Sequence, residues 1–172
     1  MNKIPEARFT EFIEFFPLLE LPLSLLPDIS QIPSVPVPLP AVLIDAYILP
    51  FEGDEADEYT EYVPYGRISG TKDFLAVIYW KAGVMQYEFV LATYNKEGNP
   101  LSHAIIGGLS SDEEGLLHSV AVIDQDMRIN IAEGLSLNED ELLDLNKTNT
   151  YQMAILPDGT ISYDMNEEDK EA

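Results

Sequence analysis

The two histidines, His103 and His118, are the first residues to test for catalytic chemistry, because imidazole is the usual acid–base group near neutral pH. Both fall in strand-like runs that flank a turn at 110–115. In one register of such a hairpin, His118 lies opposite Leu109, which is roughly 20 Å along the strand from His103. In the other register, the two side chains lie on opposite faces of the sheet. Neither register makes a histidine dyad, so we interpret both histidines as structural or surface residues.

Thiol and metal chemistry is not predicted either. The chain has no cysteine, which excludes disulfides, thiolate nucleophiles and zinc–thiolate sites. The segment 124–135 begins like a calcium-binding loop, with Asp124 and Asp126. The pattern then fails, because Arg128 occupies the fifth position and Leu135 stands in place of the final glutamate. We therefore predict no metal ion and no cofactor.

The glycine pair Gly107-Gly108 could suggest a phosphate-binding loop. It lies inside a strand-like run, however, and no helix follows it. A β-bulge or a close approach of two backbones is the interpretation that we favour. The sequence also lacks a Gly-x-Ser-x-Gly nucleophile motif. A pair of catalytic carboxylates would leave no motif, because its spacing is set in space and not along the chain.

Acidic residues dominate the charge of the chain. Asp and Glu number 31 against 9 Lys and Arg, which gives a formal net charge of -22. Such a surface repels phosphate, so nucleic acid is not an expected partner, whereas a basic protein would be attracted to it. Six acids fall within 52–61 and predict an exposed loop that binds this partner: Glu52, Asp54, Glu55, Asp57, Glu58 and Glu61.

Aromatic residues form a second candidate surface. On neighbouring strands they could line one face of the sheet, either as ordinary core packing or as a tyrosine-rich binding face. The residues of this possible aromatic face are Tyr79, Tyr87, Phe89 and Tyr94.

The charge and the missing catalytic motifs together predict a non-catalytic acidic binding protein, of the inhibitor or immunity type, that engages a basic protein. Two alternatives remain open. One is a β-barrel that binds a small molecule, or a hydrolase that uses carboxylates, and either would need a concave pocket. The other is a structural or oligomer-forming domain with a proline-rich segment as its dimer interface.

The N-terminal part of the chain should supply one helix and one strap. Residues 5–16 are predicted to form an amphipathic helix, because their apolar side chains recur at helical spacing. Its apolar stripe is Phe9, Phe12, Ile13 and Phe16. Docking on a sheet is our first interpretation of this stripe, and binding to a membrane surface or a partner is the alternative. Residues 17–40 carry prolines too densely for a helix or a central strand, and we expect a packed, extended strap. Its PxxP pattern, 33–36, is common and has no flanking basic residue.

The remainder, 41–165, is predicted to be a β-rich body. The apolar run 41–49 is taken as its first strand, and about eight strands in all follow from the regular turn signals. Consecutive hairpins favour an antiparallel meander that forms a barrel or a sandwich. A short acidic helix is expected at 137–146, and a frayed acidic tail at 166–172. The whole chain, 1–172, is predicted to be a single mainly β domain.

No membrane segment is expected. The longest uncharged run, 29–44, contains four prolines and is too short to span a bilayer. Glutamates interrupt the apolar stretch after Lys3 and Arg8, which is unlike a signal peptide. These features predict a soluble, cytoplasmic protein, and the sequence does not indicate its oligomeric state.

Overall fold

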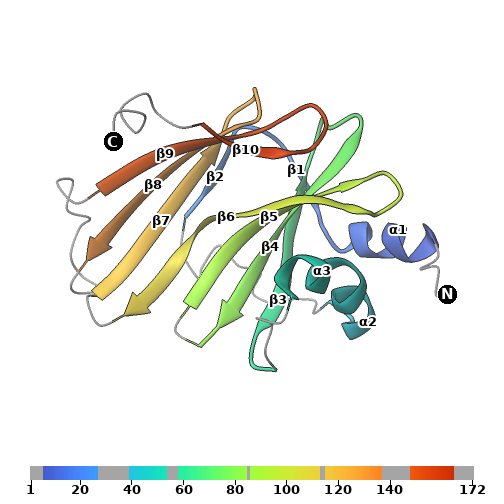
Figure 1. Cartoon of the computed structure of the whole chain (residues 1–172), viewed down its shortest axis with the longest axis horizontal. Helices are drawn as coiled ribbons and strands as arrows, with labels where there is room; N and C mark the ends of the chain where they lie inside the picture. The colour runs from blue at the N-terminus through green and yellow to red at the C-terminus, as the bar shows by residue number, and fades with distance from the viewer. Residues whose placement is uncertain are drawn as a thin grey trace.

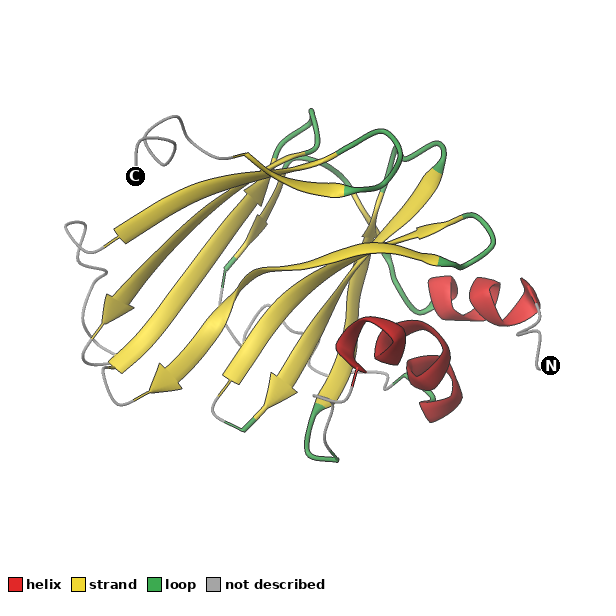
Figure 2. Cartoon of the chain, viewed as in Figure 1, coloured by secondary structure: helices red, strands yellow, loops and turns green. Residues whose placement is uncertain are grey.

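The computed structural model describes residues 6–26, 39–53, 58–84, 86–112, 115–136 and 148–164. Its main element is one sheet of ten strands, in the order β1-β3-β4-β5-β6-β7-β8-β9-β10, with β2 beside β7 (Figures 1 and 2). Consecutive strands from β3 to β10 are antiparallel, and β1 pairs with β3 in parallel. The predicted mainly β fold with a largely antiparallel meander is therefore confirmed. The strands are β1 (Leu18–Leu19), β2 (Leu23–Leu25), β3 (Glu61–Ile68), β4 (Phe74–Gly83), β5 (Gln86–Asn95), β6 (Pro100–Asp112), β7 (Gly115–Ile123), β8 (Arg128–Ser136), β9 (Thr148–Ile155) and β10 (Ile161–Asp164).

The sheet divides at the glycine pair of β6. Strand β6 pairs with β5 along its length, but it pairs with β7 only from Gly108 onward. The other end of β7, at residues 121–123, pairs with β2 instead. The register between β5 and β6 shifts next to Gly107, and Gly108 has a φ of 143°. The predicted bulge at this pair is confirmed, and it separates the half β3–β6 from the half β7–β10.

Both halves of the sheet bury one face against a shared core. Side chains alternate across a strand, so every second residue of each strand points to this inner face. The shared core includes Ile78, Trp80, Leu91 and Ile106 from the first half and Ile123, Ile129, Ile131, Met153 and Ile155 from the second. The sheet is thus bent around its own apolar side chains (Figure 1).

The barrel among the predicted alternatives is wrong. Within the described residues, no backbone ladder joins β10 to β6 or β1 to β2. Side chains bridge the first gap instead: the Ile161 amide donates to Ser102 Oγ at 3.2 Å, and Thr93 Oγ1 donates to the Gly159 carbonyl at 2.6 Å. The bulge leads β6 away from β7, so part of the edge of β7 has no partner in β6. Strand β2 pairs with only three residues of that edge, 121–123, and does not close the sheet.

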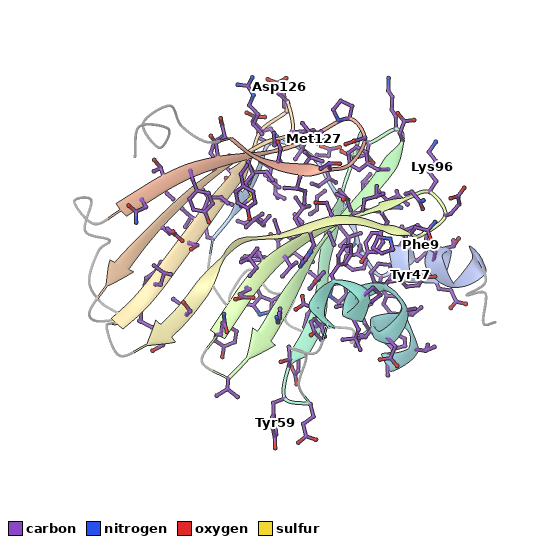
Figure 3. The ribbon with its side chains drawn as sticks, viewed as in Figure 1. Phe9, Tyr47, Tyr59, Lys96, Asp126 and Met127 are labelled. Carbon is purple, nitrogen blue, oxygen red and sulfur yellow. The ribbon has the colours of Figure 1, made fainter. Side chains whose placement is uncertain are left out.

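A helical layer covers the outer face of β3–β5 (Figure 2). It consists of α1 (Glu6–Glu14), α2 (Ala41–Leu43), the π-helical turn η2 (Ile44–Ile48) and α3 (Leu49–Glu52). The apolar stripe of α1 is buried, with Phe12 at 0% exposure. Phe9 packs on Tyr47 with ring centroids 5.3 Å apart, which joins α1 to η2 above the sheet (Figure 3). This outer core is closed from the sheet side by Val77, Tyr79, Val90, Ala92 and Tyr94.

The strand predicted at 41–49 is wrong, because these residues are helical. A continuous apolar run fits a buried strand and a buried helix equally well, so its periodicity does not decide between them. Leu43 and Tyr47 are spaced by four and both are buried, which is the spacing of one helical face. Strand β3 was also missed, because the acidic run before it was read as a loop as far as residue 61.

Only the ends of the predicted strap fall within the described residues. Residues 17–26 form two short strands with a bend at 21–22 between them: Leu18 lies opposite Arg67 on the edge of β3, and β2 lies beside β7. Leu25 is fully buried in the shared core. Residues 27–38, with the PxxP pattern, lie outside the described residues, as do the predicted helix 137–146 and the acidic tail 166–172. No described helix has the length and apolar character needed to cross a bilayer.

Candidate functional site

Glu52 does not belong to an exposed loop, as the sequence had suggested. It ends α3, and its side chain is only 7% exposed. Tyr79 donates its hydroxyl hydrogen to Glu52 Oε1 at 2.8 Å, and Lys81 Nζ donates to Oε2 at 2.6 Å. Burial works against the charge of Lys81, but the hydrogen bond and the charge of Glu52 raise its pKa above the ordinary value. Glu52 therefore ties the helical layer to the sheet and is not available as a surface acid.

The other members of the predicted acidic loop are only partly described. Glu58 and Glu61 are exposed, next to the exposed ring of Tyr59 in the turn before β3 (Figure 3). Asp54, Glu55 and Asp57 lie outside the described residues. Their predicted role in binding a partner stays a prediction.

The aromatic residues predicted to share one face lie on two. Tyr79 and Tyr94 point into the helical layer, whereas Tyr87 and Phe89 point toward the inner core. The four positions differ in strand parity, which the prediction of a single face overlooked. Tyr94 donates its hydroxyl hydrogen to the Tyr47 carbonyl at 2.5 Å. Burial raises the pKa of both Tyr79 and Tyr94 far above the ordinary value, so both hydroxyls stay protonated.

The histidines do not form a dyad, as expected. His118 lies opposite Leu109, which selects the first of the two predicted registers. His103 is exposed on β6 opposite Ala92, and its ring centroid lies 4.9 Å from that of Phe51.

The calcium-like segment is a capped turn between β7 and β8. Asp124 Oδ1 accepts hydrogen bonds from the backbone amides of Asp126, at 2.8 Å, and Arg128, at 3.0 Å. Met127, which lies at its tip beside Asp126 (Figure 3), has a φ of 65°. Among the described residues there is no cluster of three or more His, Cys, Asp or Glu that could hold a metal ion.

A cavity of about 430 Å³ lies where the two halves of the sheet part, and it opens to solvent. It begins where the shared core ends on β7 and β8: Ser119 and Glu133 lie opposite each other and continue the inward alternation of Ala121 and Ile131. Ser119 Oγ lies 3.4 Å from Glu133 Oε2, at the long limit of a hydrogen bond. The described lining consists of Gln86, Tyr87, Glu88, Ile105, Gly107, Gly108, Leu109, Ser110, Leu117, Ser119, Glu133, Tyr151, Met153 and Tyr163.

Tyrosines supply much of the wall around this polar pair. Tyr151 is half-buried, and burial together with the charge of Glu133 raises the pKa of its hydroxyl. Tyr163, on β10, is 65% exposed at the same cavity. On the other side, Tyr87 stacks on Trp80 with ring centroids 5.7 Å apart and an interplanar angle of 18°. The wall thus combines aromatic faces with a few polar groups, as ligand pockets do.

The described lining of the cavity contains Glu88 and Glu133 and no lysine, arginine or histidine. Glu88 pairs across the strands with Lys81 and alternates with the inward Tyr87 and Phe89, so Glu133 is the acid of the inner face. Glu88 is already engaged, because Gln86 Nε2 donates to it and Lys81 Nζ lies 4.0 Å away. Glu133 has no cation within ion-pair distance among the described residues. The arrangement offers one carboxylate beside aromatic rings, which suits a positively charged group.

None of the residues predicted from the sequence is Ser119, Glu133, Tyr151 or Tyr163. The described lining of the cavity comes from six strands, β5 to β10, so no local motif marks it. One signal was present: a serine and a glutamate occupy alternating positions that are otherwise apolar along β7 and β8. That signal became interpretable only once the partner strands and the inner face were known.

A second, shallower hollow of about 450 Å³ lies on the opposite, outer face of β7–β9. Its side chains alternate with those of the shared core, and we call them the neutral face: Val120, Val122, Asn130, Ala132, Thr150 and Gln152.

The chain matches no protein-family model, no curated protein and no solved structure in the comparisons made. Its function has to be inferred from the geometry of its own residues.

Proposed function

We propose that the chain is a non-catalytic binding protein whose cavity takes a small organic cation with an apolar body. The observation that carries the proposal is Glu133, which lies in a cavity of about 430 Å³ whose described lining holds no basic side chain. The volume lies within the range of roughly 300–1,000 Å³ that is typical of small-molecule sites.

The two parts of such a ligand would find different surroundings. An ammonium group pairs with Glu133, and charge-assisted hydrogen bonds of this kind are stronger than neutral ones. The ring faces of Tyr87 and Tyr151 attract a cation electrostatically and also cover an apolar body. Leu117 and Met153 supply further apolar wall. An anionic ligand of similar shape would meet the charge of Glu133 with no compensating cation in the described lining.

Catalysis by a carboxylate pair is less well supported than binding. Glycoside hydrolysis needs two carboxyl groups that flank the bond, one of them free to act as base or nucleophile. Glu88 is held by Gln86 and lies near Lys81, so it is committed to contacts within the protein. Glu133 is then the one carboxylate of the described lining that suits a ligand.

Intrinsic fluorescence provides the test. Trp80 is the only tryptophan of the chain, and it stacks on Tyr87 in the cavity wall. Titration with 2-phenylethylamine should therefore change the Trp80 emission in a saturable way. The anion 3-phenylpropionate, which has the same phenylethyl body, should bind at least about 10-fold more weakly, because one charge-assisted contact is worth about 1.5–3 kcal/mol.

The matched variants are Glu133→Gln and Glu61→Gln. Glu133→Gln should abolish the preference for the amine, whereas Glu61→Gln, at an exposed site on β3, should leave it unchanged. Equal binding of amine and carboxylate by the wild-type protein would overturn the proposed ligand class. Turnover of a glycoside that depends on Glu133 would overturn the non-catalytic assignment.

Binding of a basic protein partner is a second candidate function, and the exposed acids of the helical layer support it. Its described solvent-facing acids include Glu11, Glu14 and Asp45, and the chain has no Lys or Arg from residue 9 to residue 66. Neutralising Asp54, Glu55, Asp57 and Glu58 together should slow association with such a partner and leave stability nearly unchanged. Association at the wild-type rate would make these acids a solubility feature only.

A further inference from the structure

The neutral face is unusual because of what it lacks. In a chain with 31 acidic residues, none of its six side chains is charged. The same outward alternation continues through His118, Arg128 and Ala154, and on β10 it ends at Asp164, whose backbone pairs with Gln152 at the edge of the face. Val122 is 41% exposed, and among the described residues no helix covers this half of the sheet. The face therefore presents β-branched and amide side chains and none that is charged.

The symmetry of self-association explains why such a face would be free of acids. In a two-fold dimer, the same patch meets itself, so every acid in the patch would be brought close to its own copy. With a net charge of -22 on each chain, two copies repel one another over most of their surfaces. On the neutral face this local repulsion is small, because none of its six side chains is charged.

We propose that the neutral face is an interface through which two copies of this chain associate. Valine, alanine and threonine can pack face to face as two sheets do, about 10 Å apart. Asn130 and Gln152, which already hydrogen-bond to each other at 2.8 Å, supply polar groups that can pair across the interface. A basic protein would gain nothing from this face, because its complement is the acidic surface of the helical layer.

The size of the face predicts a weak dimer. Strands β7–β9 at about 4.8 Å spacing, over eight residues at about 3.4 Å each, give roughly 400 Å² of flat area per copy. Two copies would bury on the order of 800 Å², which is below the size of a standard interface and within the range of weak, transient contacts. Dissociation constants in the micromolar range or above follow, so the dimer forms only in concentrated solution.

The dependence of self-association on salt concentration tests this proposal separately. Added salt screens the repulsion between two negatively charged copies, so raising NaCl from about 20 mM to about 500 mM should tighten self-association several-fold. Binding of a basic protein partner would weaken over the same range. The two directions keep this inference distinguishable from the acidic-surface function, and neither result depends on the cavity.

Sedimentation velocity of the full chain over a concentration series is the main test. Val122→Glu places an acid on the neutral face and should weaken self-association at least about 10-fold. Val42→Glu is the matched control, because Val42 lies on α2 with a similar exposure, 47% against 41%. A monomer at all concentrations up to about 1 mM in high salt would overturn the proposal. So would a dimer that Val42→Glu disrupts and Val122→Glu does not, or a dimer that salt weakens.

A spin-label experiment keeps the proposal testable if Val122→Glu fails to fold. The chain has no cysteine, so a single Cys can be introduced at Thr150 or at Val42 and labelled alone. Labels at Thr150 should show a short intermolecular distance in high salt, and labels at Val42 a longer one or none. The reverse order of distances would place the contact on the helical layer and overturn the inference.

Discussion

The outer surface of this bent sheet is completed in two different ways. Over β3–β5, a helical layer buries the outward side chains, including Val77, Val90 and Ala92. Over β7–β9, the outward side chains form the neutral face and stay at the surface. Strands with both faces buried read as continuous apolar runs, whereas half-exposed strands alternate. The difference between β4, FLAVIYWKAG, and β8, RINIAEGLS, follows this rule.

The comparison shows that one sheet can bury its inner face uniformly while its outer face changes role at a single point. That point is the glycine pair of β6, where the two halves separate and the cavity opens. The covered half contributes stability through a second core. The bare half leaves room for contacts with other molecules.

The largest expected effect separates the two halves by stability. Phe12→Ala should lower the free energy of unfolding by about 3–5 kcal/mol, because the ring is fully buried and packs on Tyr47 at 4.9 Å and Phe16 at 5.0 Å. Val122→Ala, on the neutral face, should cost less than about 1 kcal/mol, since the side chain is partly solvated already. Urea denaturation of both variants measures the difference. Equal losses would show that the neutral face is also buried and would remove the contrast.

The second largest effect on stability is expected at the glycine pair of β6, where the two halves of the sheet separate. A Cβ on Gly108 would lie 2.1 Å from the Tyr87 carbonyl oxygen, at a φ of 143° that other residues rarely adopt. Gly108→Ala should therefore lower stability by about 1–3 kcal/mol. Gly83→Ala is the control, because its nearest contact is 3.8 Å away and its φ is ordinary, and its effect should be near zero. An unchanged free energy of unfolding in Gly108→Ala would mean that the backbone at the glycine pair can relax to accommodate a Cβ.

These two positions also show how far the sequence could predict the fold. Phe12 was assigned to a buried stripe and Gly108 to a bulge, because spacing in a helix and a glycine in a strand are local signals. The helical segment 41–52 was missed, since an apolar run has no period that separates helix from strand. The closure of the sheet was also beyond reach, because it depends on which distant edges meet.

The candidate site was harder to predict than the fold. The acidic loop and the aromatic face were chosen by composition, and the structure places Glu52 in a buried ion pair and the four aromatic residues on two faces. Glu133 shares the cavity with residues of β5, β6, β7, β9 and β10, far from it in the chain. Composition identifies a residue type, but only the pairing of strands brings side chains from such distant positions together.

The third effect tests the covered half in alkaline solution. Burial raises the pKa of Tyr94 above its ordinary value of 10.0, so the folded protein keeps a proton that the unfolded chain releases above that pH. The contribution of this tyrosine to the free energy of unfolding is therefore fully present below pH 10. It is lost as the pH rises further, by about 1.4 kcal/mol per pH unit for each such tyrosine. Tyr79, also buried with a raised pKa, contributes in the same direction.

Tyr94→Phe isolates this contribution. The variant should lose about 1 kcal/mol at neutral pH, because the hydrogen bond to the Tyr47 carbonyl is removed. Above pH 10, its stability should fall less steeply than that of the wild-type protein, by about 1.4 kcal/mol per pH unit. Parallel slopes for wild type and Tyr94→Phe would mean that Tyr94 ionises freely in the folded state.

The smallest expected change in the free energy of unfolding is at the neutral face, and it tests whether this face is exposed to solvent in the monomer. Asn130→Thr removes the hydrogen bond from Gln152, but both side chains can bond to water, and threonine suits a strand better than asparagine does. In dilute protein, the free energy of unfolding should change by less than about 0.5 kcal/mol. In concentrated protein and high salt, any association that favours the folded state adds a concentration-dependent term, which the variant should reduce. A loss above about 1.5 kcal/mol in dilute solution would mean that Asn130 is covered within the single chain, and the neutral face could then not be the surface on which two copies meet.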